Sequence, residues 1–128
     1  MKSIVFFTLS FICIELLAQT NTNPEKEWEM KQYYMVFLTK GPNRNQDSTT
    51  AANIQKGHLE NIGRLNKEKK LIVAGPFLDD QNMRGIFIFD VPTEKEVIDL
   101  LNTDPAIIAG RLSYEIHPWM TAKGNCFE

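Results

Sequence analysis

The residue of this chain best suited to proton transfer is His58, which lies in an amphipathic stretch of the sequence. An imidazole titrates near neutral pH, so it can take up and release a proton during a reaction. The alternative is a solvent-facing or capping histidine with no chemical role, since nothing in the neighbouring residues requires catalysis. The residues around His58 leave both interpretations open.

A second candidate is Asp104, which directly precedes Pro105. Proline is favoured in the first turn of a helix, so this pair predicts the N-cap of a short helix beginning there. Such a cap is a purely structural role worth about 1 kcal/mol. A carboxylate has two oxygens, however, and the second is free to orient a histidine.

Three further residues are candidates for binding a small molecule. Gly75 and Pro76 close an apolar run, and a glycine there would let a ligand approach the backbone, although the end of a strand explains both residues equally well. Arg84 has the geometry to bind a carboxylate, but it is also an ordinary residue beside a turn. His117 precedes Pro118 at the end of an apolar run, and we expect it at a subunit interface rather than in a pocket.

Other kinds of chemistry find no support in the sequence. The two histidines, at positions 58 and 117, have neither a cysteine pair nor the HExxH spacing of a metal site. No glycine-rich loop of the phosphate-binding kind is present, and no serine stands in the context of a nucleophile elbow. We therefore expect no metal and no cofactor, and acid/base chemistry is what remains.

These residues depend on four strands and two main helices to position them. Apolar and β-branched runs predict strands at 33–39, 71–77, 84–91 and 111–117, the last ended by Pro118. Helices are predicted at about 50–69 and after Thr93, which forms a capping-box pattern with Glu96. The order is β-α-β-β-α-β, so the predicted fold is α+β and ferredoxin-like, with the helices on one face of an antiparallel sheet.

The strands also predict a partner. Residues 34–38 and 86–89 are apolar at successive positions, so both faces of the sheet carry apolar side chains. Two helices cover only one face, and a large uncovered apolar patch is rare on soluble proteins. We therefore expect a homodimer in which the two sheets pack against each other.

Three short motifs resemble the YCII-related family of dimeric α+β barrel proteins. They are His-Leu at 58–59, Ala-Gly-Pro-Phe at 74–77 and Asp-Pro-x-x-x-Ala-Gly at 104–110, within a resemblance that covers about residues 33–119. The resemblance implies that His58 and Asp104 are the active residues and form an acid/base pair. By analogy with relatives of this fold, it implies a lyase or isomerase acting on a small oxygenated or aromatic compound.

Two alternatives to an enzyme remain at this stage. In one, the chain is a non-catalytic exported module that binds a small molecule in the same pocket. In the other, His58 and Asp104 form a structural pair that stabilises the dimer.

The first residues are typical of a signal peptide. Lys2 precedes an apolar run at 4–14, and Ala18 stands before a polar segment, so residues 1–18 are predicted to direct export to the periplasm or outside the cell. The run is too short for a membrane anchor. A flexible linker is expected at 19–32, the folded domain at 33–120 and a tail at 121–128. Cleavage after Ala18 would leave Cys126 without an internal disulfide partner.

The length and charge of the chain restrict its class. With 128 residues it holds one domain, and its 43% hydrophobic content suffices for a packed core. Its formal net charge of −2 provides no attraction for nucleic acid. A small-molecule ligand of unknown identity is the expected partner.

Overall fold

A computed structural model describes residues 27–124. The predicted signal peptide, most of the linker, residues 125–128 and both cysteines lie outside this range, so the expectations about them stay predictions.

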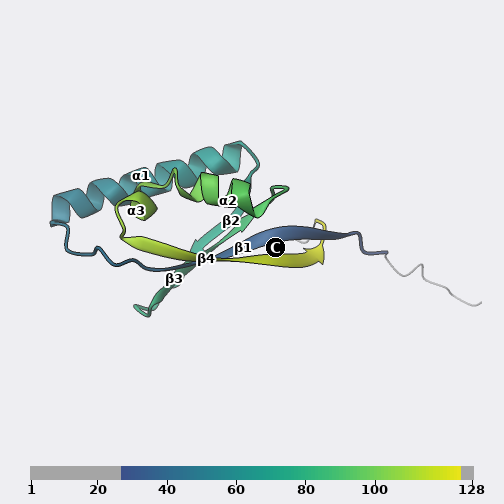
Figure 1. Ribbon diagram of the computed structural model, residues 1–128, viewed down its shortest axis with the longest axis horizontal. Coiled ribbons are helices and arrows are strands. Elements are labelled where there is room, and N and C mark those ends of the chain that lie inside the picture. The colour runs from purple at the N-terminus through teal and green to yellow at the C-terminus, as the bar shows by residue number, and fades with distance from the viewer. Residues whose placement is uncertain (1–26, 125–128) are drawn as a thin grey trace, which may run out of the picture.

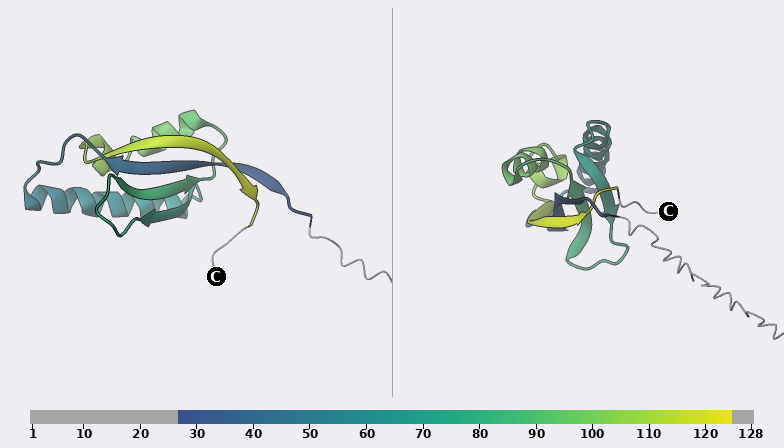
Figure 2. Two further views of the ribbon diagram at one scale, coloured as in Figure 1. Left: turned by 90° about the horizontal axis from the view of Figure 1, so that it is seen from below. Right: turned by 90° about the vertical axis from the view of Figure 1, so that its right-hand side faces the viewer.

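The described chain forms a four-stranded antiparallel sheet with the helices on one face (Figure 1, Figure 2). The elements are β1 (Met30–Lys40), α1 (Ser48–Lys67), β2 (Leu71–Pro76), β3 (Met83–Phe89), α2 (Glu94–Leu101), α3 (Pro105–Ile108) and β4 (Leu112–Ala122). The strand order in the sheet is β2-β3-β1-β4. This is the predicted ferredoxin-like β-α-β-β-α-β arrangement, with the short helix α3 inserted before the last strand.

Two predicted strand ends differ from the observed ones by three residues or more, and the others by at most two. The sequence indicated that Pro118 ends the last strand, but β4 continues through it to Ala122, and Pro118 pairs with Tyr34 of β1. Proline is tolerated because β4 lies at the edge of the sheet, where a missing N–H need not break a ladder. The longer β4 also extends its partner, so β1 begins at Met30, inside the segment expected to be a linker.

The core lies between the sheet and the helices. Alternate residues of the two central strands, β1 and β3, point toward the helices, as the pleat requires. The buried cluster joins them to α1, α2 and β2 and includes Val36, Leu38, Phe87, Phe89, Leu65, Leu71, Val97 and Leu101. Apolar burial of this kind is the main stabilising contribution to the domain.

Both long helices begin at side-chain caps. Asp47 accepts a hydrogen bond from the backbone N–H of Thr50, so α1 starts at Ser48, slightly earlier than predicted. Thr93 accepts one from the N–H of Glu96, which is the first half of the predicted capping box. The carboxylate of Glu96 instead pairs with Lys70, at 3.0 Å, and so ties α2 to the loop between α1 and β2.

Candidate active site

The candidate site is built on α1, α3 and the ends of β2 and β3. In α1, Gln55, His58, Leu59 and Ile62 follow one another at helical spacing, so they share one face of the helix. That face lines a pocket against the sheet. The sequence pattern of α1 contained this spacing, but only His58 was singled out from it.

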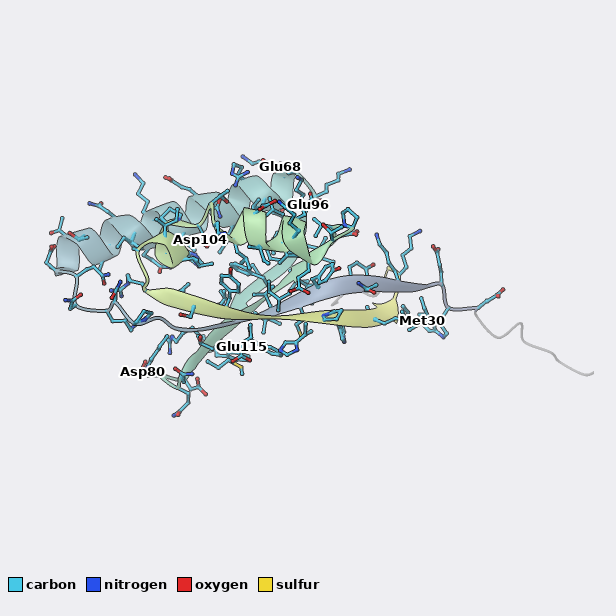
Figure 3. All side chains as sticks on the ribbon, viewed as in Figure 1. Met30, Glu68, Asp80, Glu96, Asp104 and Glu115 are labelled. Atoms are coloured by element: carbon cyan, nitrogen blue, oxygen red, sulfur yellow. The ribbon has the colours of Figure 1, made fainter. Side chains whose placement is uncertain are left out.

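Asp104 makes both of the contacts that its position allows. Its Oδ1 accepts a hydrogen bond of 2.8 Å from the backbone N–H of Ala106, which makes it the N-cap of α3. Its Oδ2 lies 2.7 Å from Nδ1 of His58. Asp104 is 1% exposed and His58 is 8% exposed, so this contact is shielded from water. Figure 3 shows Asp104 between α3 and α1.

This geometry selects one tautomer of the imidazole. An ionised carboxylate accepts hydrogen bonds and donates none, so opposite an ionised Asp104 the Nδ1 of His58 carries the hydrogen. Nε2 then holds the lone pair. Nε2 has no hydrogen-bond partner within residues 27–124. No side-chain nitrogen in that range is both fully buried and without a partner, so Nε2 is not fully buried. Nε2 therefore keeps some exposed surface, and His58 is one of the residues that line the pocket.

The pocket is small and mostly apolar. Its volume is about 220 Å³, and its lining consists of Leu38, Gln55, His58, Leu59, Ile62, Ala74, Gly75, Pro76, Gly85 and Phe87. A cavity of about 150 Å³ is large enough to hold benzene, so this pocket has room for a single substituted ring. The Phe87 ring lies nearly parallel to the imidazole of His58, with 6.0 Å between ring centroids and 21° between planes.

Two contacts hold α1 against the segment that carries Asp104. Gly57 has no side chain where Pro105 packs: a Cβ at position 57 would lie 2.9 Å from Cγ of that proline. Further along the helix, Nη2 of Arg64 donates to Oδ1 of Asn61, at 2.7 Å, and to Oγ1 of Thr103, at 2.9 Å. Thr103 directly precedes Asp104, so this bridge positions the carboxylate relative to His58.

The other candidate residues separate into two groups. Gly75 and Pro76 line the pocket together with His58. Arg84 does not, because its guanidinium donates to the carbonyls of Asp79 and Gln81 and to the carboxylate of Asp80, which holds the turn between β2 and β3. These contacts fit the interpretation of Arg84 as a residue that stabilises a turn.

His117 lies away from the pocket. It contacts the Phe37 ring edge-on, with 5.5 Å between centroids, on the face of the sheet opposite the helices. Its side chain is 56% exposed.

The described part of the chain offers neither a metal site nor a membrane span. Residues 27–124 contain no group of three or more histidine, cysteine, aspartate or glutamate side chains placed to hold a metal ion. Within the same range, the helices are too short or too polar to cross a membrane.

The fold and the site together define a ferredoxin-like α+β protein with a buried histidine–aspartate pair at the wall of an apolar pocket. Residues 32–120 match the YCII-related domain, and the chain belongs to that family. The resemblance found in the sequence is thereby confirmed.

Individual relatives agree with this assignment. The uncharacterized protein YjpA of Bacillus subtilis (strain 168) is 30% identical over 67 residues, which cover 52% of this chain and 76% of YjpA.

Solved structures share the fold at lower identity. The 5-chloro-2-hydroxyhydroquinone dehydrochlorinase of Burkholderia phenoliruptrix AC1100, in complex with 2,5-dihydroxybenzoquinone, is 22% identical with a TM-score of 0.54, and the match covers 73% of this chain and 99% of that one. A muconolactone isomerase is 17% identical with a TM-score of 0.58, covering 75% of this chain and 96% of the other. At these identities the two structures establish the α+β fold alone.

Proposed function

We propose that this protein is a cofactor-independent enzyme of the lyase or isomerase type that acts on a small oxygenated ring compound, with His58 as its general base. The observation that carries the proposal is the 2.7 Å contact between Nδ1 of His58 and Oδ2 of Asp104 at the wall of the pocket. It leaves the lone pair of Nε2 available to a bound molecule, which is the arrangement that a general base requires.

The chemistry begins with one proton transfer. Nε2 of His58 removes a proton from the substrate and becomes part of an imidazolium, whose charge the Asp104 carboxylate stabilises. In an isomerisation, the imidazolium returns the proton to another atom of the same molecule. In an elimination, the electron pair of the broken bond forms a double bond while a leaving group departs with its own electron pair, and the proton later passes to water.

The pocket and the structural neighbours support this class of substrate. The apolar lining and the Phe87 ring suit a flat, weakly polar molecule. A dehydrochlorinase bound to 2,5-dihydroxybenzoquinone and a muconolactone isomerase share the fold, which adds support by analogy only.

We also propose that the active form is a homodimer packed sheet against sheet. Met35, Phe37 and Ile86 are only partly buried, and they alternate with residues of the core, so they lie on the face without helices. Ile88 lies on that face as well. Figure 3 shows Glu115 on the same side. A second copy would cover this apolar surface with an identical one, as a two-fold interface does.

A proton-exchange experiment tests the catalytic proposal. The full chain is incubated in deuterated water with muconolactone or with 5-chloro-2-hydroxyhydroquinone, and NMR follows deuterium incorporation while an electrode follows chloride release. We expect turnover of 5-chloro-2-hydroxyhydroquinone, the compound without a carboxylate, and a loss of about 100-fold or more in His58→Gln. Lys56→Gln is the matched control, because this exposed residue of the same helix is not among the residues that line the pocket.

Two results would overturn the proposal. One is equal turnover by His58→Gln and the wild-type chain. The other is the absence of both exchange and chloride release with the two compounds, which would favour a binding module instead of an enzyme.

A further inference from the structure

The pocket contains few polar side chains, and this restricts what it can bind. Of its ten lining residues, only His58 and Gln55 have polar side chains, and none carries a carboxylate, an ammonium or a guanidinium. A charged ligand group buried there would lose its hydration without gaining an ammonium, guanidinium or carboxylate partner from the residues that line the pocket. The lining thus disfavours carboxylated and phosphorylated compounds.

Gln55 stands one helical turn before His58. Residues three apart on a helix have Cβ atoms about 5–6 Å from each other, so both side chains reach the same side of the pocket. The carboxamide of Gln55 makes no side-chain hydrogen bond within residues 27–124, unlike the Arg64 and Asn61 groups further along the helix. It offers one acceptor and two donor hydrogens to a ligand.

We propose that Gln55 is a substrate-binding residue, and that the pocket selects an uncharged single-ring compound with oxygens at two separate ring positions. One oxygen would bind the Gln55 carboxamide, and the other end of the ring would present a proton to Nε2 of His58. The apolar residues Leu59, Ile62 and Phe87 would enclose the ring between them. This inference rests on the proposed function, because it assigns the substrate class of the same site.

Two compounds that differ by one carboxylate test the selection. Hydroquinone and 2,5-dihydroxybenzoate are titrated into the full chain, and NMR follows the imidazole signals of His58 as a measure of binding that needs no turnover. The signals are assigned by their loss in His58→Gln. We expect hydroquinone to bind at least 10-fold more tightly, since the benzoate must leave its charge unpaired or remain outside the pocket.

Substitutions of Gln55 test its role directly. Gln55→Leu keeps a similar size without the carboxamide, and it should weaken hydroquinone binding about 10-fold, the effect of one lost hydrogen bond. Gln55→Arg supplies a partner for a carboxylate, and it should reverse the preference toward 2,5-dihydroxybenzoate. Gln32→Leu is the matched control, since Gln32 is an exposed residue of β1 outside the pocket lining.

The inference would be overturned if neither compound bound, if both bound equally well to the wild-type chain, or if Gln55→Leu bound hydroquinone as tightly as the wild type. Binding is measured separately from catalysis, so failure of the two proposals is distinguishable. A chain that selects hydroquinone through Gln55 but passes no proton to or from a substrate would retain this inference and lose only the proposed enzymatic activity.

Discussion

Asp104 makes two different contacts with the two oxygens of one side chain. One oxygen caps α3 through the N–H of Ala106, and the other accepts the hydrogen of His58 Nδ1. The helix cap holds the carboxylate in place, and the carboxylate in turn holds the imidazole. Two substitutions can separate these roles, because asparagine is as good an N-cap as aspartate whereas alanine is not.

Asp104→Asn should preserve most of the free energy of unfolding. It should also take away the lone pair on Nε2 of His58, which is the proposed general base. If the carboxamide oxygen keeps the Ala106 N–H, its NH₂ group faces Nδ1 of His58 and favours the tautomer with hydrogen on Nε2. Asp104→Ala should lower the free energy of unfolding by about 2–4 kcal/mol, from the lost cap and an unpaired buried group. Thermal denaturation and ¹⁵N NMR of the imidazole check both expectations. Equal losses of stability in the two variants would contradict them.

At the scale of elements, the distance between α1 and α3 determines whether His58 and Asp104 meet. Gly57 allows this approach, because a Cβ there would lie 2.9 Å from the Pro105 ring. A proline ring is rigid, so the neighbouring helix would have to move rather than a flexible side chain. Gly63, in the same helix, has nothing within 4 Å of the point that a Cβ would occupy, and it provides the comparison.

Gly57→Ala and Gly63→Ala should therefore have opposite effects. Alanine is favoured over glycine in a helix by about 1 kcal/mol, and Gly63→Ala should gain up to that amount. In Gly57→Ala, the contact with Pro105 should displace α3, lower the melting temperature and weaken the His58–Asp104 hydrogen bond. Thermal denaturation and the Nδ1–H resonance of His58 measure these effects. A stabilised Gly57→Ala with an unchanged resonance would be evidence against the contact.

The stability that the Asp47 cap gives to the first turn of α1 should decrease at acidic pH. Hydrogen bonds from the Thr50 backbone N–H, and then from its hydroxyl, lower the pKa of Asp47 below its usual 3.8. A lowered folded-state pKa means that the stabilisation is present above the unfolded pKa and is lost as the pH falls through the folded pKa. Between about pH 5 and about pH 2, the wild type should lose more stability than Asp47→Asn, which caps without titrating. Thermal denaturation of the wild type and of Asp47→Asn, measured side by side at each pH, tests this difference in stability.

At the scale of the whole molecule, the sheet has one covered and one uncovered face. The helices cover the side on which Val36, Leu38 and Phe87 are buried (Figure 1). The opposite side carries Phe37 and Ile86, which are directly paired across β1 and β3. Charge introduced at this pair would have to be buried between two sheets in the proposed dimer.

The wild-type chain should therefore elute as a dimer, and Phe37→Glu as a folded monomer. Light scattering after size-exclusion chromatography gives the mass, and circular dichroism checks the fold. If Phe37→Glu fails to fold, Ile86→Glu makes the same test at the paired position. Leu78→Glu is the control, since Leu78 is 99% exposed in the turn after β2. A monomeric wild-type protein, or dimeric interface variants, would rule out the sheet-to-sheet arrangement.

The sequence by itself determined the order and type of the elements. The apolar and β-branched runs, the caps at Thr93 and Asp104 and the Gly75–Pro76 pair at the end of a strand are local signals, and local backbone preferences act over a few neighbouring residues. The motifs also indicated the family and its two candidate active residues. Local signals failed at Pro118, because only the place of β4 at the sheet edge makes a proline acceptable there.

Only the tertiary structure decided which side chains meet. His58 and Asp104 are 46 residues apart, and their contact depends on how α3 packs on α1 at Gly57. The packing of α1 against the sheet likewise gives Gln55 a place in the pocket beside residues of β2 and β3. Such contacts form between segments remote in sequence, and no local pattern encodes their distance or orientation. The elements can therefore be predicted from the chain, whereas the site exists only once they are packed.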